Sequence, residues 1–298
     1  MSAPAARSGG QRQYTALILA GSRGAADPVA SAARLPHKAL VPIAGRAMVL
    51  RVIDTLRQIP EVGRIVLCID DPRIVTSLPE LRAAVEAGEI ATVAAAHSPA
   101  ASVLAALKRV SEPLPLLIAT ADHPLLTAEM VRYFLGALGD AEAAATVATE
   151  AVIAPAYPQT RRTYVRLKDG AYSGCNLFAF VSPDAARAAQ FWTEVERYRK
   201  QPWRLFAAAG PWSLLLFLLR RLDLAAAVAR LSQTLNVRLR VVTLPFAEAA
   251  IDVDKPCDLA LVEKIFASRV ASWPLGDGFA GKVSTTPGVS QGKSGHGV

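Results

Sequence analysis

The sequence predicts an α/β fold in which helices cover both faces of a mostly parallel sheet. Strand-length apolar runs alternate with helical patterns, 52% of the 298 residues are hydrophobic, and aromatic residues make up only 6%. Strands that alternate with helices form right-handed crossovers within a parallel sheet, which helices then cover. Ligands of such sheets gather at the carboxyl ends of the strands. We therefore expect a three-layer α/β/α architecture with its binding site along that edge.

The predicted strands and helices alternate along most of the chain. Ser98 and Thr127 are suited to cap the helices that follow them. Residues 170–181 alternate near their end, and we expect this strand to run antiparallel to the others. The predicted strands cover residues 15–20, 64–69, 90–95, 114–120, 144–149 and 240–244, and the predicted helices cover residues 47–58, 79–87, 99–110, 127–138 and 183–199.

We expect one folded domain over residues 14–272, because a chain of this length and hydrophobicity can bury one sizeable core. Residues 1–13 and the Gly/Ser-rich residues 273–298 are predicted to be disordered. The cysteines are far apart and form no Cys-x-x-Cys pair, and no signal-peptide core is apparent, so we expect reduced, buried thiols in a cytoplasmic protein. They are Cys68, Cys175 and Cys257.

The positive charge is concentrated in one region. Residues 187–240 hold ten basic residues and three acidic ones, although they lack the interleaved aromatic residues of a nucleic-acid-binding module. Within a predicted basic and apolar helical insertion over residues 187–238, the nearly uncharged segment 205–219 is too short to span a bilayer. We favour a buried core helix or a homodimer contact. The alternative is that residues 204–221 lie on a membrane surface.

A loop of small residues after the first predicted strand is suited to bind phosphate. Gly21 and Gly24 let the backbone turn sharply and lie close to a ligand. Arg23 offers a guanidinium that matches phosphate oxygens two at a time, and Lys38 adds a compact positive charge. The alternative is that the glycines serve only the turn. The loop lacks the Gly-x-Gly-x-x-Gly pattern of dinucleotide-binding dehydrogenases.

Carboxylates follow two of the predicted strands. Asp122 ends a buried strand, where its charge is costly unless a cation such as Mg²⁺ compensates it. Asp252 and Asp254 are two residues apart, which in an extended segment directs both carboxylates to one side, so either could complete a metal site. The alternative for Asp122 is that it caps the next turn. We interpret Asp258 as a helix cap and His123 as a structural neighbour.

Four motifs follow one another along the chain: Leu19-Ala20-Gly21 with Arg23, Lys38 to Met48, Asp122-His123-Pro124-Leu125-Leu126, and Asp252 to Leu259. In this order they resemble those of the MobA-like nucleotidyltransferases of the NTP-transferase superfamily, over roughly residues 14–266. The resemblance implies a GT-A-like Rossmannoid sheet that binds a nucleoside triphosphate. It also implies transfer of the nucleotidyl group to a small phosphorylated acceptor with release of pyrophosphate.

The resemblance also assigns roles to matching residues. Arg23 and Lys38 are expected to hold the triphosphate and to neutralise charge at the reacting phosphate. Asp122 is expected to bind Mg²⁺, with Asp254 as the second ligand and Asp252 as the reserve. The other assigned residues are the nucleotide-binding Ala20, Gly21, Ser22, Ser98 and Ser102, and the acceptor-binding Gly174 and Asn176.

The sequence departs from the family pattern in two places. One glycine of the usual first loop is missing, and residues 25–37 are inserted before Lys38. Lys255 replaces a small residue beside the acidic turn. Two rival functions stay open: a GT-A glycosyltransferase that uses Asp252 and Asp254 as a metal-binding pair, and a non-catalytic nucleotide-binding protein at a membrane surface.

Overall fold

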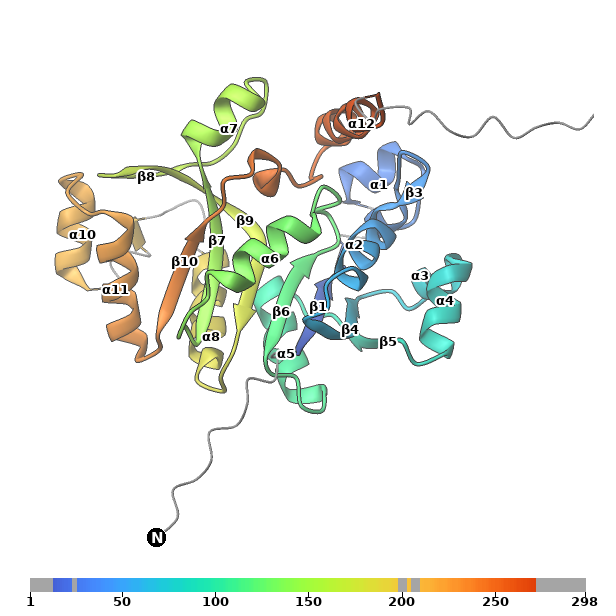
Figure 1. Cartoon of the computed structure of the whole chain (residues 1–298), viewed down its shortest axis with the longest axis horizontal. Coiled ribbons are helices and arrows are strands. Elements are labelled where there is room, and N and C mark those ends of the chain that lie inside the picture. The colour runs from blue at the N-terminus through green and yellow to red at the C-terminus, as the bar shows by residue number, and fades with distance from the viewer. Residues whose placement is uncertain (1–12, 23–25, 198–202, 205–209, 272–298) are drawn as a thin grey trace, which may run out of the picture.

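The centre of the protein is one sheet of eight strands (Figure 1). The computed structural model describes residues 13–22, 26–197, 203–204 and 210–271. The strands lie in the order β10 (Leu239–Thr243), β7 (Ala143–Thr149), β9 (Gly170–Phe180), β6 (Leu116–Thr120), β1 (Tyr14–Leu19), β4 (Val62–Ile69) and β5 (Ile90–Ala94), and β8 (Val165–Leu167) pairs with β9.

Strand direction agrees with the sequence pattern. The pairs β1–β4, β1–β6, β4–β5 and β7–β10 are parallel, whereas β9 is antiparallel to β6, β7 and β8. The prediction of one antiparallel strand near residues 170–181 is therefore confirmed. β6 begins at Leu116 rather than at residue 114, because Pro115 has no N–H to donate to a neighbouring strand.

Helices connect the strands, and side chains cap several of them. The Ser98 and Thr127 side chains accept hydrogen bonds from Ala101 N and Met130 N at the helix starts, as predicted. The helices are α1 (Pro28–Ala32), α2 (Met48–Arg57), α3 (Arg73–Ser77), α4 (Pro79–Glu86), α5 (Pro99–Arg109), α6 (Ala128–Gly136), α7 (Glu150–Ala156), α8 (Ala185–Arg197), α10 (Pro211–Leu218), α11 (Leu224–Leu235) and α12 (Pro256–Ala271). Short elements complete the fold: 3-10 turns at Lys38–Leu40 and Ala247–Ala250, and the hairpin β2 (Pro42–Ile43) and β3 (Arg46–Ala47).

The sheet is covered on both faces, because alternate side chains of β1 enter different apolar clusters. Ala16 and Ile18 belong to a cluster with residues of α2, α4 and α6. Leu17 and Leu19 belong to a second cluster with residues of α5 and α8. Successive side chains of a strand point to opposite faces, so a run that is apolar throughout requires a helical layer on each side. The predicted three-layer architecture is thus confirmed.

A third apolar cluster joins the C-terminal part of the chain to its beginning. Val29 of α1 and Met48 of α2 pack in it with Val253 and with Val262 of α12. Figure 1 shows α12 beside α1, above the sheet edge where β1 and β6 end. The inserted residues 25–37 therefore contain a helix that contributes to holding α12 in place.

Two expectations from the sequence are wrong. We predicted three buried thiols, but Cys257 is exposed at the start of α12, while Cys68 and Cys175 are buried. We favoured a buried core helix or a homodimer contact near residues 205–219. The exposed side chains of Trp212 and Leu218 on α10 contradict the core helix. The homodimer contact stays a prediction, and residues 205–209 lie outside the described residues. Among the helices that the structure describes, none combines the length and apolarity needed to cross a membrane. The predicted disordered ends lie outside the described residues, apart from Gln13.

Candidate active site

Neighbouring parallel strands deliver the candidate residues to one edge of the sheet. Ala20 and Gly21 follow β1, and Asp122 follows β6, which pairs directly with β1. The pairing continues beyond the strands, because Ala121 N donates to Leu19 O at 2.9 Å. The loop after β1 and the carboxylate after β6 therefore lie beside each other, as the carboxyl-edge rule predicts.

Lys38 is the centre of the site. Its Nζ lies 2.8 Å from Asp122 Oδ2 and 3.0 Å from Asp254 Oδ1, and its side chain is only 11% exposed. Burial lowers the pKa of Lys38, but the charges and hydrogen bonds of the two carboxylates outweigh burial and raise its pKa above the usual value. Lys38 is therefore a cation at neutral pH, and three predicted residues converge on one point.

His37, which the sequence analysis missed, caps the 3-10 turn Lys38–Leu40, called the Lys38 turn below. His37 Nδ1 accepts a hydrogen bond from Ala39 N at 3.0 Å, so the ring proton is on Nε2. His37 Nε2 then donates to Asp70 Oδ1 at 2.9 Å, and the other oxygen of Asp70 accepts from Ser22 N at 3.3 Å. Asp70 therefore links the Lys38 turn to the loop after β1. Asp70 could have been found from the sequence, because it comes directly after the strand β4, just as Asp122 comes shortly after the strand β6.

The role of Asp70 can be tested by neutralising its charge. The asparagine side chain has one acceptor oxygen, so Asp70→Asn cannot accept from both Ser22 N and His37 Nε2. For the nucleotide that the family resemblance implies as substrate, we expect KM to rise about three- to tenfold, which corresponds to one hydrogen bond of about 1 kcal/mol. We expect kcat to change less, because Asp70 contacts the loop and the turn but not Asp122. Steady-state kinetics would measure both constants.

Asp71→Asn is the matched control for this change. Asp71 is the next residue, and its carboxylate pairs with Arg73 rather than with His37 or Ser22. An equal rise in KM for Asp70→Asn and Asp71→Asn would contradict the assigned link.

Main-chain hydrogen bonds bring the distant acidic segment to Asp122. Val253 N donates to Asp122 O at 2.9 Å, which fixes Asp254 beside Lys38. Thr120 Oγ1 donates to Asp122 Oδ1 at 2.5 Å and orients that carboxylate. Asp258 Oδ2 accepts from the backbone N of Asp254 and of Lys255 at 3.2 and 2.9 Å, so it caps the start of α12, as predicted.

Asp252 is engaged by other partners. It forms an ion pair with Arg162 and accepts a hydrogen bond from Asn176 Nδ2 at 3.3 Å. Burial, together with the charges of Asp122 and Asp254, raises the pKa of Asp252, while Arg162 opposes the rise. Asp252 therefore lies near the cluster formed by Lys38, Asp122 and Asp254, called the Lys38 cluster below, but it forms no ion pair with Lys38. Arg162 comes from a segment without helical or strand periodicity, so sequence patterns had no signal for it.

The described part of the loop after β1 contains one polar group without a hydrogen-bond partner. Gly21 is outside the left-handed region, and a Cβ added there would meet Ala95 Cβ at an ordinary 3.8 Å. Neither the backbone conformation at position 21 nor the packing around it therefore requires a glycine, contrary to the sharp turn that we expected there. Ser22 Oγ is buried without a hydrogen-bond partner among the described residues. Arg23 and Gly24 lie outside the described residues.

Two predicted nucleotide-binding serines order their own turn after β5. Ser98 Oγ accepts from Ala101 N at 3.2 Å. Ser102 Oγ donates to Ser98 O at 2.8 Å and accepts from Ala96 N at 2.9 Å. Their hydroxyls therefore fix the shape of the turn at the same carboxyl edge as the Lys38 cluster.

Gly174, predicted to bind the acceptor, lies two residues from Asn176 on the same face of β9. Nothing lies within 4 Å of a Cβ built on Gly174, so the space beside Asn176 is open.

The carboxylates around Lys38 fit a magnesium ion that is shared with a substrate. Asp122 and Asp254 face a common point, because both contact the same ammonium nitrogen. In the described part of the chain, no group of three or more His, Cys, Asp and Glu side chains forms a ready-made metal cage. Mg²⁺ typically binds one or two carboxylates, retains water and takes its remaining ligands from phosphates. The donor set is therefore suited to a metal that takes its other ligands from water and from a phosphate-bearing ligand.

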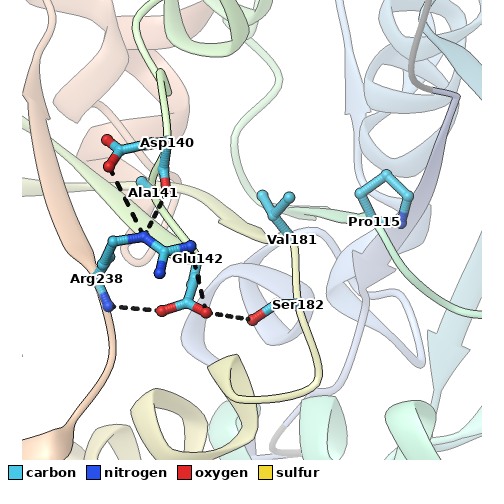
Figure 2. Close-up of a pocket in the computed structure, with 7 residues that line it drawn as sticks. All are labelled: Pro115, Asp140, Ala141, Glu142, Val181, Ser182 and Arg238. Atoms are coloured by element: carbon cyan, nitrogen blue, oxygen red, sulfur yellow. Dashed lines mark hydrogen bonds and ion pairs between the residues drawn. The ribbon is translucent and has the colours of Figure 1, made fainter. Parts of the chain in front are cut away.

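A hollow of about 460 Å³ lies at the opposite edge of the sheet, where the strands β7 and β10 begin (Figure 2). Its polar groups satisfy one another: Glu142 accepts from Arg238 N at 2.9 Å and from Ser182 Oγ at 3.3 Å, and Arg238 Nε donates to Asp140 O at 3.0 Å. These bonds hold the amino ends of β7 and β10 together. We therefore interpret this hollow as part of the scaffold.

Comparisons with known proteins now identify the family. The model of the MobA-like NTP transferase domain matches residues 16–234, which is more than half of the chain. The chain belongs to this family. The match includes Lys38 and Asp122 but ends before Asp252 and Asp254. A comparison with curated proteins finds no significant match.

Solved structures show the same fold. A hypothetical transferase from Thermus thermophilus is 30% identical, with a TM-score of 0.67 over 83% of this chain and 99% of that chain. The 4-diphosphocytidyl-2C-methyl-D-erythritol synthase of Anaerococcus prevotii is 15% identical, with a TM-score of 0.51 over 87% of this chain and 100% of that chain. A CMP:2-keto-3-deoxy-manno-octonic acid synthetase in complex with CTP is also 15% identical, with a TM-score of 0.50 over 87% of this chain and 100% of that chain.

Proposed function

We propose that this protein is a Mg²⁺-dependent nucleotidyltransferase that moves a nucleoside monophosphate from a nucleoside triphosphate to a small phosphorylated acceptor and releases pyrophosphate. The observation that carries the proposal is the position of Lys38 Nζ between Asp122 and Asp254. This arrangement combines one buried cation with two carboxylates suited to bind a metal, beside a loop suited to bind phosphate. Membership of the MobA-like NTP transferase family supports the same reaction class.

The proposed reaction needs charge neutralisation and alignment rather than a covalent nucleophile. A phosphate oxygen of the acceptor attacks the α-phosphorus in line, a new P–O bond forms, and the bond to the β-phosphate oxygen breaks as pyrophosphate leaves. Lys38 and Arg23 neutralise the triphosphate charge. Asp122 and Asp254 would hold Mg²⁺, which polarises phosphoryl oxygens when it is bound.

The loop after β1 is proposed to cradle the triphosphate. Ser22 Oγ is buried and has no partner among the described residues, which is costly in the free protein, and a phosphate oxygen would satisfy it. Since the fold does not itself require glycine at position 21, close approach of a phosphate is a physical reason for glycine there. The turn ordered by Ser98 and Ser102 would lie against the base and ribose.

The acceptor is proposed to bind on the β9 side of Lys38. Arg162 and Asn176 both contact Asp252, and Gly174 leaves open space beside Asn176. A guanidinium there matches the phosphate of an acceptor in charge and shape. Arg162 is therefore our addition to the acceptor residues predicted from the sequence.

Pyrophosphate release tests the proposal. The full chain would be assayed with each of the four common ribonucleoside triphosphates, with and without Mg²⁺, against a panel of sugar phosphates and other phosphorylated alcohols. We expect release that requires both an acceptor and Mg²⁺. Sugar transfer from a nucleotide-sugar without pyrophosphate would instead assign a glycosyltransferase. Nucleotide binding without turnover of any acceptor would favour a non-catalytic role.

Asp252 and Asp254 are expected to have separable effects. Asp254→Asn should raise the Mg²⁺ concentration needed for half-maximal activity about tenfold or more, because it removes one charged metal ligand. Asp252→Asn should chiefly raise the KM for the acceptor, because Asp252 orients Arg162 and Asn176. Metal and acceptor titrations of both variants would measure these effects. The reverse assignment would make Asp252 the metal ligand and overturn this part of the proposal.

A further inference from the structure

An apolar surface on α10 has no role in the proposed chemistry. The side chains of Trp212, Leu215, Leu218 and Leu219 are 57%, 42%, 63% and 55% exposed. We call these four residues the α10 patch. In the rest of the described chain, the only other large apolar side chains with comparable exposure are those of Tyr133 and Trp203. Such a concentration marks an interaction surface, because isolated exposed apolar residues are common but clusters are not.

The patch is a stripe along one side of a short helix. Trp212, Leu215 and Leu219 are spaced by three and four residues and so share one helical face, while Ser213 is buried on another side. Gly210 adopts a φ of 103°, which L side chains rarely adopt, and Pro211 then opens the helix. Leu222, just beyond the helix, is 1% exposed and anchors the segment to the protein.

Basic residues flank the patch in the sequence. Between Glu196 and Asp223 the sequence contains six basic residues and no acidic one. Arg220 and Arg221 directly follow the exposed Leu218 and Leu219 and are themselves exposed. Arg220 has a φ of 54°, the left-handed conformation that commonly ends a helix. Two exposed cations therefore directly follow the exposed apolar side chains at the C-terminal end of the patch.

Charge decides which partner fits this surface. In a two-fold dimer the same patch would face itself, and residues 211–221 contain no acidic side chain that could pair with Arg220 or Arg221 of the other copy. A lipid surface with anionic headgroups instead complements the arginines, and the apolar side chains enter the acyl boundary beneath them. At about 1.5 Å per residue, the eight residues of α10 are far too short to span a bilayer.

The position of α10 allows docking without covering the candidate active site. Figure 1 shows α10 and α11 at the end of the molecule beyond β10, whereas α12 and the carboxyl ends of β1 and β6 lie toward the middle. We propose that the α10 patch and its flanking arginines bind the surface of a membrane that contains anionic phospholipid. This inference does not depend on the proposed reaction.

Vesicle flotation with the full chain tests the inference. We expect the protein to float with vesicles of phosphatidylcholine and phosphatidylglycerol but not with phosphatidylcholine alone, and binding should fall as salt is raised. Trp212→Ala/Leu218→Ala should lower binding at least tenfold, with unchanged thermal stability and unchanged turnover in solution. Tyr133→Ala removes an exposed apolar side chain elsewhere and should bind as the wild type does.

A charge-matched pair completes the test. Arg220→Ala/Arg221→Ala and Lys108→Ala/Arg109→Ala each remove two exposed adjacent cations, the latter from the end of α5. Only the first pair should weaken vesicle binding. If both double variants lost vesicle binding equally, the effect would come from net charge alone, and the inference would be overturned. A lack of vesicle binding would also overturn it, and if sedimentation then gave a dimer that Leu218→Asp dissociates, the surface would belong to a second copy.

Discussion

Asp122→Asn is expected to lower kcat for pyrophosphate release by about a thousandfold or more, equivalent to about 4 kcal/mol of transition-state stabilisation. Asparagine keeps the size of the side chain and can still accept from Thr120 Oγ1, so the fold should persist. The variant loses the charge that Mg²⁺ and Lys38 require. Thermal unfolding with and without nucleotide would separate loss of catalysis from loss of structure.

Asp258→Asn is the matched control for Asp122→Asn. Asp258 is a carboxylate close to the site in sequence, but it accepts hydrogen bonds from the backbone at the start of α12. Its replacement should cost about 1 kcal/mol of folding stability or less and leave kcat nearly unchanged. If Asp122→Asn retained a tenth of the wild-type kcat, Asp122 would not be the principal metal ligand.

Lys38→Met is expected to change activity and metal binding in opposite directions. Turnover of the triphosphate should fall about 100- to 1000-fold, or about 3–4 kcal/mol, because no cation replaces the ammonium beside the reacting phosphate. Without nucleotide, the variant should bind Mg²⁺ more tightly than the wild type, since Lys38 Nζ no longer competes for oxygens of Asp122 and Asp254. Calorimetry with Mg²⁺ alone would measure this second effect.

A merely structural lysine would not produce these opposite effects. Lys264→Met removes an exposed lysine from α12 and serves as the control, with kinetics and metal affinity expected to match those of the wild type. Weaker Mg²⁺ binding by Lys38→Met would mean that the lysine organises the carboxylates rather than competing for them. Unchanged turnover would remove Lys38 from the proposed mechanism.

Taken alone, the sequence determined the fold class and the edge of the sheet on which the site lies. Strand-length apolar runs in alternation with amphipathic helices require a parallel sheet with two covering layers. Asp122 could be placed because it directly follows such a run, and the position of Asp70 after β4 carried the same signal. These inferences are local, because periodicity and turn residues act over a few positions.

Only the tertiary structure decided which side chains meet. Lys38 contacts carboxylates 84 and 216 residues away, and Arg162 contacts Asp252 across 90 residues. These pairings follow from long-range main-chain bonds such as that from Val253 N to Asp122 O, for which no sequence period exists. The exposure of α10 could not be predicted from the sequence either, because the same apolar run can be buried in a core or exposed on the surface. Burial depends on what packs against a segment, and that is a property of the folded chain.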